Sequence, residues 1–230
     1  MTSRVIFFDM GQTLVTGAAQ SPRRLLASRL ALSEKETRKV GRLIMTHPAT
    51  ELSSLVPALK GILVDREQRC MKNTLEAIWE EQGRCVKEID GATAVLRALK
   101  SKGFKLGLLS TTWHPLFEGF CRSCPEMAEL LDLTALSYRL GCKKPSPGIF
   151  HQALEQAGAP AEQCWMVGDS YELDIEPALA VGMRTIWVLR NPEREKALLA
   201  QVLRGEKDHP ESSVVHLDEI LAFFASKGWL

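Results

Sequence analysis

Four short segments of this chain carry side chains that can do chemistry. They are FFDMGQTLV at residues 7–15, LGLLST at 106–111, GCKKPSPGIF at 141–150 and MVGDSYELDI at 166–175. In that order they supply a carboxylate, a hydroxyl, an ammonium group and a pair of carboxylates: Asp9, Ser110, Lys144, Asp169 and Asp174. A nucleophile, a hydrogen-bond donor and charged groups of both signs are the parts that group transfer at a polar centre requires. The four segments together form an inventory for an active site.

The residues before three of these groups predict buried strands. Short apolar runs at 5–8, 105–109 and 165–168 are typical of strands buried on both faces of a parallel sheet. They end at Asp9, Ser110 and Asp169, and ligands of parallel α/β sheets bind at the carboxyl ends of the strands. Any one of these residues alone could simply cap a helix. Together with a lysine, they predict a single site at one edge of the sheet.

The rest of the pattern predicts an α/β fold with a helical insert. Gly91 opens an amphipathic helix that Gly103 stops, and strands and helices then alternate, as crossover connections of a parallel sheet do. From residue 21 to residue 88 the apolar spacing is helical, with no convincing buried strand. The later elements are a weak strand at 133–137, helices at 146–158 and 174–181, strands at 185–189 and 214–216, a polar stretch at 190–210 that is part surface helix and part loop, and a terminal helix.

Composition restricts the partners. The 230 residues are 45% apolar and 25% charged, with a net charge of +1, so the chain can bury one full core and has no basic field for nucleic acid or anionic lipid. We find no signal peptide and no apolar stretch near the roughly 20 residues of a membrane span. We expect a cytoplasmic protein, a monomer or homodimer, with a small-molecule partner. The six cysteines are expected to be reduced thiols, and the single pair Cys121 and Cys124 is a weak signal for metal or redox use.

The four segments resemble the four motifs of the haloacid dehalogenase superfamily of hydrolases. The likeness lies in their order, their strand context and the detail GxxKPxPxxF at residues 141–150, and it covers the chain from residue 4 to about residue 189. It implies a Rossmann-like parallel-sheet core of residues 1–16 and 89–230. It also implies an inserted all-helical cap at 17–88, which moves on linkers near 16–20 and 86–90 and closes over the site.

The resemblance assigns a role to each residue of the site. It implies a Mg²⁺-dependent hydrolase, most simply a phosphatase for a small phosphorylated metabolite that works through an aspartyl-phosphate intermediate. Hard oxygen ligands suit Mg²⁺, and a cation and a lysine let a carboxylate approach a phosphate. The implied roles are nucleophile for Asp9, hydrogen bonding of the transferred group for Ser110, charge neutralisation for Lys144, metal binding for Asp9, Asp169 and the Gly11 carbonyl, orientation of Lys144 or metal-bound water for Asp174, and support for Thr13 and Thr111.

Gly11 departs from the phosphatase pattern, in which the residue two positions after the nucleophile is an aspartate that serves as acid and base. Its loss is worth about 10²–10⁴ in rate. A narrow phosphatase for good leaving groups such as acyl phosphates fits this change, and so does a binding protein that retains the metal and phosphate site without turnover. Dehalogenases also lack that aspartate, but they do not depend on Mg²⁺ and usually lack the GD pair. Phosphonate cleavage would need a cap lysine, for which Lys60 and Lys72 are only guesses.

Two further questions stay open at this level. His114, four residues past Ser110, titrates in the useful range and is a candidate replacement for the missing acid. The cap residues that set specificity are undetermined among Arg23, Arg24, His47 and Trp79. Because adjacent residues of a helix point about 100° apart, at most one of Arg23 and Arg24 is expected to reach an anionic group.

Overall fold

A parallel sheet forms the centre of the molecule. The computed structural model describes residues 4–64 and 66–229, and within these residues a six-stranded sheet has the order β5-β4-β1-β6-β7-β8, with every neighbouring pair parallel. Numbered along the sheet alone, this is the 3-2-1-4-5-6 order of a Rossmann fold, which confirms the predicted fold class. The strands are β1 (Val5–Phe8), β4 (Lys105–Ser110), β5 (Leu133–Leu136), β6 (Cys164–Gly168), β7 (Arg184–Val188) and β8 (Ser212–Val214).

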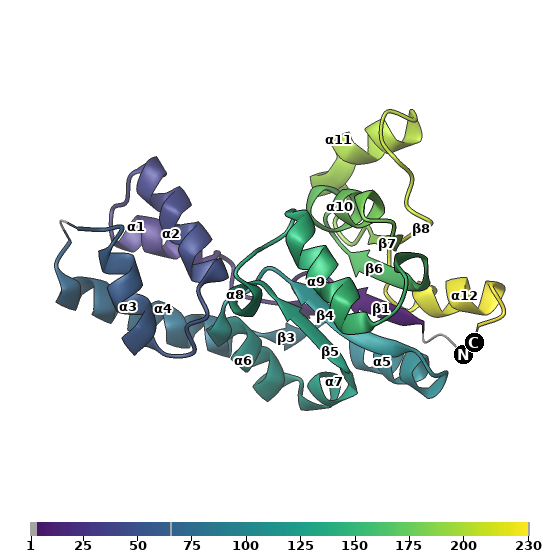
Figure 1. The fold of residues 1–230 in the computed structure, drawn as a ribbon, viewed down its shortest axis with the longest axis horizontal. Coiled ribbons are helices and arrows are strands. Elements are labelled where there is room, and N and C mark those ends of the chain that lie inside the picture. Colours follow the sequence, from purple (N-terminus) through teal and green to yellow (C-terminus); the bar gives the residue numbers. More distant parts are fainter. Residues whose placement is uncertain (1–3, 65, 230) are drawn as a thin grey trace.

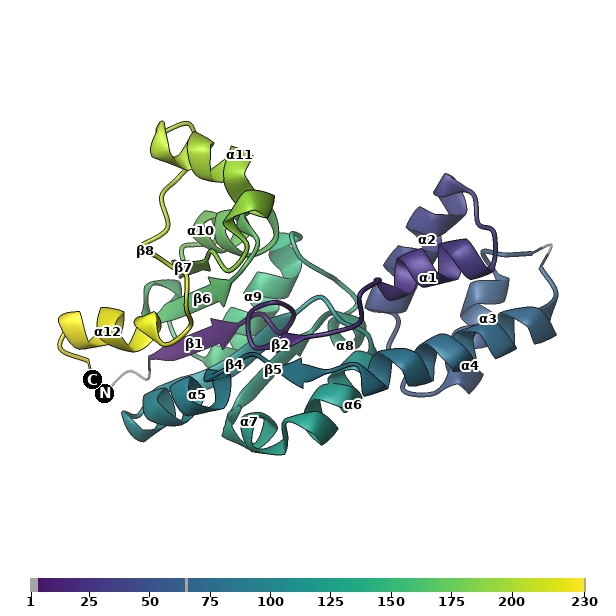
Figure 2. The ribbon, with the colours of Figure 1, turned by 180° about the vertical axis from the view of Figure 1, so that it is seen from behind.

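Both faces of the sheet are covered by helices, as the apolar runs require (Figures 1 and 2). Ile6 and Phe8 of β1 pack on one face with α5 (Ala92–Ser101), α6 (His114–Ser123), α7 (Pro125–Leu130) and α12 (Glu219–Ser226). Val5 and Phe7 point to the other face and pack with α9 (Pro147–Ala157) and α10 (Glu176–Ala180). The alternation follows from the two-residue period of a strand. The buried strands hold the polar residues at their ends in fixed positions.

The shorter connecting elements complete the core. Helix α11 (Pro192–Leu203) packs through Val202 on Trp187 of β7 and on Tyr171 and Ile175, which follow β6. The other elements of this part are α8 (Ser137–Leu140), a 3₁₀ turn η1 (Ala161–Gln163) and a π-helical turn η2 (Tyr171–Ile175). The polar stretch at 190–210 is therefore helix over most of its length, as the sequence predicted in part.

The segment between residues 17 and 88 folds into four helices beside the sheet (Figures 1 and 2). They are α1 (Pro22–Arg29), α2 (Glu34–Thr46), α3 (Leu52–Lys60) and α4 (Gln68–Arg84), and they share a hydrophobic cluster. The chain enters and leaves this segment through β2 (Val15–Thr16) and β3 (Lys87–Glu88), which pair antiparallel. The sequence did not predict this two-stranded ribbon. The division of the chain into a core and a separate cap stays a prediction.

Several contacts hold these helices against the core. Trp113, which precedes α6, is buried in the hydrophobic cluster of α1–α4. Helices α4 and α6 approach so closely at Gly83 and Gly119 that a Cβ on Gly119 would lie 2.4 Å from the Gly83 carbonyl oxygen. The same carbonyl accepts a hydrogen bond from Arg122, at 2.8 Å. The last turn of α4 is thus bound to the core, while the rest of the four-helix segment lies farther from the sheet.

Some predicted boundaries differ from the structure. The helix predicted at 174–181 begins earlier, at η2, because the backbone first makes a wide turn at Tyr171–Ile175. The strand predicted at 214–216 lies at Ser212–Val214, since the His216 N–H donates to Glu219 at the start of α12. All six cysteines are free, as predicted. Within the part of the chain that the structure describes, no helix is long and apolar enough to cross a membrane.

Candidate active site

Asp9 lies where the sheet reverses its strand order. Strand β1 pairs with β4 on one side and β6 on the other, so its carboxyl end opens onto the crevice in which α/β sheets bind ligands. The Asp9 N–H donates to the Val167 carbonyl at 2.8 Å, which fixes the backbone of Asp9 beside the end of β6. Asp169 follows two residues after Val167. The Asp9 residue is 8% exposed, so it is largely buried but still open to a ligand.

Lys144 joins two of the predicted carboxylates. Its Nζ donates to Asp9 Oδ1 at 2.6 Å and also to Asp174 Oδ1, and the whole residue is 4% exposed. Burial alone would lower the pKa of Lys144, but the carboxylates of Asp174 and Asp9 outweigh it and raise that pKa above its ordinary value. The Lys144 N–H donates to Thr111 Oγ1 at 3.1 Å. Thr111 therefore holds the lysine loop in place, and the lysine stays charged at physiological pH.

A glycine makes room for Asp174. A Cβ on Gly168 would lie 2.4 Å from Asp174 Cγ, so the carboxylate occupies the space that a side chain would fill at the end of β6. The Ser170 N–H donates to Asp174 Oδ2 at 3.0 Å. Burial raises the pKa of Asp174, and the neighbouring Lys144 ammonium opposes this increase. The π-helical turn thus directs Asp174 inward, and Gly168 is required for close approach.

Three carboxylates crowd this edge of the sheet. Oxygens of Asp9, Asp169 and Asp174 all lie within 4.8 Å of one another. Burial, followed by the charges of Asp9 and Asp174, raises the pKa of Asp169 to about 7, although Arg194, at 3.3 Å from Asp169 Oδ2, acts in the opposite sense. A dense set of oxygen ligands with excess negative charge fits a hard divalent cation such as Mg²⁺. Asp9 and Asp169 are the carboxylates that would hold it.

Ser110 ends the strand that pairs with β1, and Gly11 follows Asp9 in the loop after β1. Ser110 is the last residue of β4 and is 2% exposed. Gly11 lies two residues after Asp9, and a Cβ built on it meets no atom within 4 Å. The next residue, Gln12, has a φ of 62°, an unusual backbone conformation for a residue with a side chain. The site therefore has open space where the phosphatase pattern places a second aspartate.

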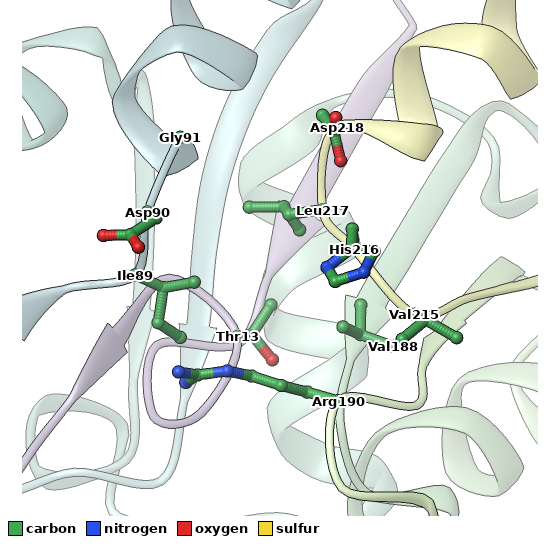
Figure 3. A pocket seen from close by; sticks show the side chains of 10 residues that line it. All are labelled: Thr13, Ile89, Asp90, Gly91, Val188, Arg190, Val215, His216, Leu217 and Asp218. Atoms are coloured by element: carbon green, nitrogen blue, oxygen red, sulfur yellow. The ribbon is translucent and has the colours of Figure 1, made fainter.

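Thr13 lies apart from this group. Its side chain lines a cavity of about 660 Å³, together with residues of the linker before α5 and of the segment around β8, and none of Asp9, Ser110, Lys144 and Asp169 lines it (Figure 3). Among the residues that the structure describes, the buried Thr13 hydroxyl has no hydrogen-bond partner. The supporting role of Thr13 therefore stays a prediction.

The surroundings of His114 do not favour a role as proton donor. Its ring lies beside Tyr138 and Trp79, and Nδ1 is 3.4 Å from the Tyr138 hydroxyl. Removal from water lowers the pKa of His114, an effect that Glu118 opposes. The neutral imidazole is therefore favoured at neutral pH. That His114 takes over the role of the missing aspartate stays a prediction, and these contacts do not support it.

Sequence reasoning missed three groups that support the site. Arg194 of α11 pairs with Asp169, and the Trp187 indole donates to the Asp169 carbonyl at 3.2 Å. The Ser137 hydroxyl donates to the Thr112 carbonyl at 2.9 Å and accepts from the Thr112 N–H at 3.0 Å, which fixes the loop after Ser110. Each lies 18 to 25 residues from its partner. No spacing in the sequence signals these contacts.

The site and the sheet order define a class of protein, and comparison with known families agrees. The family model for haloacid dehalogenase-like hydrolases matches residues 4–182, and this chain belongs to that family. The matched range includes all four segments that carry Asp9, Ser110, Lys144 and Asp169.

Among individual relatives, the glyceraldehyde 3-phosphate phosphatase of Methanothermobacter thermautotrophicus is 25% identical over 94% of this chain and 96% of its own length. The protein of the same name from Pyrococcus abyssi is 36% identical, but the match covers 44% of this chain and 42% of the relative. The chain thus matches less than half the length of that second relative.

Solved structures show the same fold. A 2-haloacid dehalogenase from Pseudomonas syringae superposes with a TM-score of 0.65 at 18% identity, covering 98% of this chain and 99% of the other. A haloacid dehalogenase-like (HAD) hydrolase from Bacillus subtilis, whose structure has bound magnesium, superposes with a TM-score of 0.60 at 17% identity. The match covers 98% of this chain and 100% of the other. At such identities the likeness establishes the fold and leaves the reaction open.

Proposed function

We propose that this protein is a Mg²⁺-dependent phosphatase for a small phosphorylated metabolite, with Asp9 as the nucleophile. The observation that supports this most directly is the buried arrangement of Asp9, Lys144 and Asp174, with Asp169 within 4.8 Å. In this arrangement Asp9 is the nucleophile, Lys144 is a fixed cation beside it, and Asp169 is a second carboxylate that could bind a metal. The relatives named as phosphatases support the choice of a phosphate substrate.

The residues of the chain account for each part of the reaction. Asp9 attacks phosphorus, the bond from phosphorus to the ester oxygen breaks, and the leaving oxygen takes a proton from water because Gly11 offers none. Lys144 lowers the negative charge on Asp9 and so lets the phosphate approach. Ser110, at the end of β4, would donate a hydrogen bond to the phosphoryl oxygens. Water then cleaves the aspartyl phosphate, which releases inorganic phosphate and restores the Asp9 carboxylate.

The metal would be held by the Asp9 and Asp169 carboxylates and the Gly11 carbonyl. When bound, Mg²⁺ neutralises charge on the phosphoryl oxygens as they pass to the nucleophile. Asp174 and the Ser170 N–H that binds it keep the Lys144 ammonium in position against Asp9. Burial raises the pKa of Asp169, and the neighbouring charges of Asp9 and Asp174, which the metal would offset, raise it further.

One alternative has an observation in its favour. The open space at Gly11 leaves no acid two residues from Asp9, so the same geometry also suits a protein that binds metal and phosphate without turnover. Phosphatase activity on acyl phosphates separates the two, because such leaving groups depart without protonation. Dehalogenation would proceed without Mg²⁺ and would release halide.

Turnover of a substrate panel tests the proposal. We expect purified protein to release phosphate from acetyl phosphate and from phosphate esters in Mg²⁺, with the highest rate on acetyl phosphate. We expect the rate to fall to background in EDTA and in Asp9→Asn, because the amide is not a nucleophile for phosphorus. Glu172→Gln is the matched control, since Glu172 is an exposed acid of η2 beside the site.

Three other results are informative. Binding of Mg²⁺ and phosphate without release from any substrate would instead establish the binding protein. Activity that persists in EDTA would contradict the role of the metal. Halide release from a 2-haloacid would contradict the choice of substrate.

A further inference from the structure

Three cationic side chains meet at the junction of the four-helix segment and the core. Arg23 belongs to α1, Arg42 to α2, and Lys143 directly precedes the lysine that contacts Asp9. Helix α2 packs against α8, and the chain runs from α8 through residues 141–143 to Lys144 (Figures 1 and 2). This packing brings α2 beside the loop that carries Lys143.

A glycine of α2 fixes the position of Arg23. A Cβ on Gly41 would lie 2.4 Å from Arg23 Cδ and 2.7 Å from Arg23 Cγ, so the arginine stem lies directly over Gly41. Gly41 is buried and precedes Arg42 in the chain. The stem of Arg23 therefore lies against α2 at the residue before Arg42, and the charges of Arg23 and Arg42 both act on Lys143.

The three cations repel one another. Burial lowers the pKa of Lys143, and the charges of Arg23 and Arg42 lower it further. In the structure of residues 4–64 and 66–229, none of these three side chains makes an ion pair or a hydrogen bond, whereas the side chains of Arg29, Arg38 and Arg84 in the same segment are each paired with a glutamate. Like charges that are gathered without a carboxylate are stabilised when an anion binds between them.

We propose that Arg23, Arg42 and Lys143 form a second anion site, and that the substrate is a phosphorylated compound with a second anionic group, a carboxylate or another phosphate. The inference rests on the proposed function, because the first phosphate is assigned to Asp9. Lys143 directly precedes Lys144, whose ammonium group contacts Asp9, so the second anion site adjoins the phosphate site and we expect a short carbon skeleton to span the two. The site would select against neutral ends such as an aldehyde or a hydroxyl.

Two substrates with the same skeleton test the inference. 3-Phosphoglycerate carries a carboxylate where glyceraldehyde 3-phosphate carries an aldehyde. We expect wild-type kcat/KM to be at least tenfold higher for 3-phosphoglycerate, and a bisphosphate of similar length serves as the probe for a second phosphate. We expect Arg42→Gln and Lys143→Gln each to raise KM for the doubly anionic substrate about tenfold, with little change for glyceraldehyde 3-phosphate.

Two further variants separate position from charge. Gly41→Ala keeps all three cations but displaces the Arg23 stem, and it is expected to weaken binding of the doubly anionic substrate in the same direction. Arg24→Gln removes an exposed charge next to Arg23 and is expected to leave both substrates unchanged. Equal kcat/KM for the two substrates, or variants that affect both equally, would overturn the inference.

Binding by calorimetry keeps this test separate from the proposed function. If no substrate is turned over but 3-phosphoglycerate binds and loses affinity in Arg42→Gln, the second anion site stands and the phosphatase proposal fails. If acetyl phosphate is hydrolysed but 3-phosphoglycerate has no advantage in binding or turnover, the phosphatase proposal stands and the second anion site fails.

Discussion

Replacement of Gly11 by aspartate is expected to increase the hydrolysis of alkyl phosphates by about 10²–10⁴-fold. An alkoxide is a poor leaving group, and an acid two residues after Asp9 would protonate it as the bond to phosphorus breaks. This corresponds to about 3–5 kcal/mol of the activation barrier. The structure has space for the change, because a Cβ at residue 11 meets no atom within 4 Å and the backbone there is not in the left-handed region.

The choice of substrate and a matched variant make this test specific. Acetyl phosphate should gain little, since its leaving group departs without a proton. Gly11→Asn has nearly the same shape without an acid and is expected to leave the rate on alkyl phosphates near that of the wild type. If Gly11→Asp is no faster than Gly11→Asn on any ester, the missing aspartate does not limit the reaction.

Replacement of Lys144 by methionine is expected to destabilise the protein by about 3–5 kcal/mol at pH 8 in EDTA. The ammonium neutralises Asp9 and Asp174, which are 8% and 1% exposed, and methionine would leave both carboxylates buried without a cation. Unfolding in urea, followed by circular dichroism, measures the loss. Lys35→Met is the control, because Lys35 is an exposed residue of α2 and has no ion pair in the described structure.

The pH dependence of this loss has a definite sign. Burial raises the pKa of Asp174 in the folded protein, and without Lys144 that pKa should rise further. A carboxyl with a folded-state pKa above its unfolded value costs stability as the pH rises above the unfolded value. The Lys144→Met variant should therefore lose less stability at pH 5 than at pH 8. A loss that is equal at the two pH values, or smaller at pH 8, would contradict the proposed charge balance.

The sequence was sufficient to predict the centre of the sheet and to place several candidate residues at the same end of its strands. Strands β1, β4 and β6 are continuous apolar runs, and such runs end where the chain reaches the sheet edge, so Asp9, Ser110 and Asp169 could be placed together. Lys144 lies in a loop, and it was placed by the family motif. Its hydrogen bond to Asp9 agrees with that placement.

Features that depend on packing between distant segments could not be predicted. Strands β2 and β3 have two residues each, too few for a periodic pattern. The π-helical turn depends on the space that Gly168 leaves for Asp174, and the choice between Arg23 and Arg24 depends on the contact of α1 with Gly41. Arg194 reaches Asp169 only because α11 folds back over the last strands. In each case the deciding contact is tertiary.

The most direct test of the account is detection of a phosphoryl group on Asp9 during turnover. The protein is mixed with acetyl phosphate and Mg²⁺, quenched in acid within the first turnover, digested and analysed by mass spectrometry. We predict a phosphorylated peptide with the modification at Asp9, absent in EDTA and in Asp9→Asn. Phosphate release in Mg²⁺ with no modification at Asp9, or with the same rate in Asp9→Asn, would contradict the assignment of Asp9 as the nucleophile.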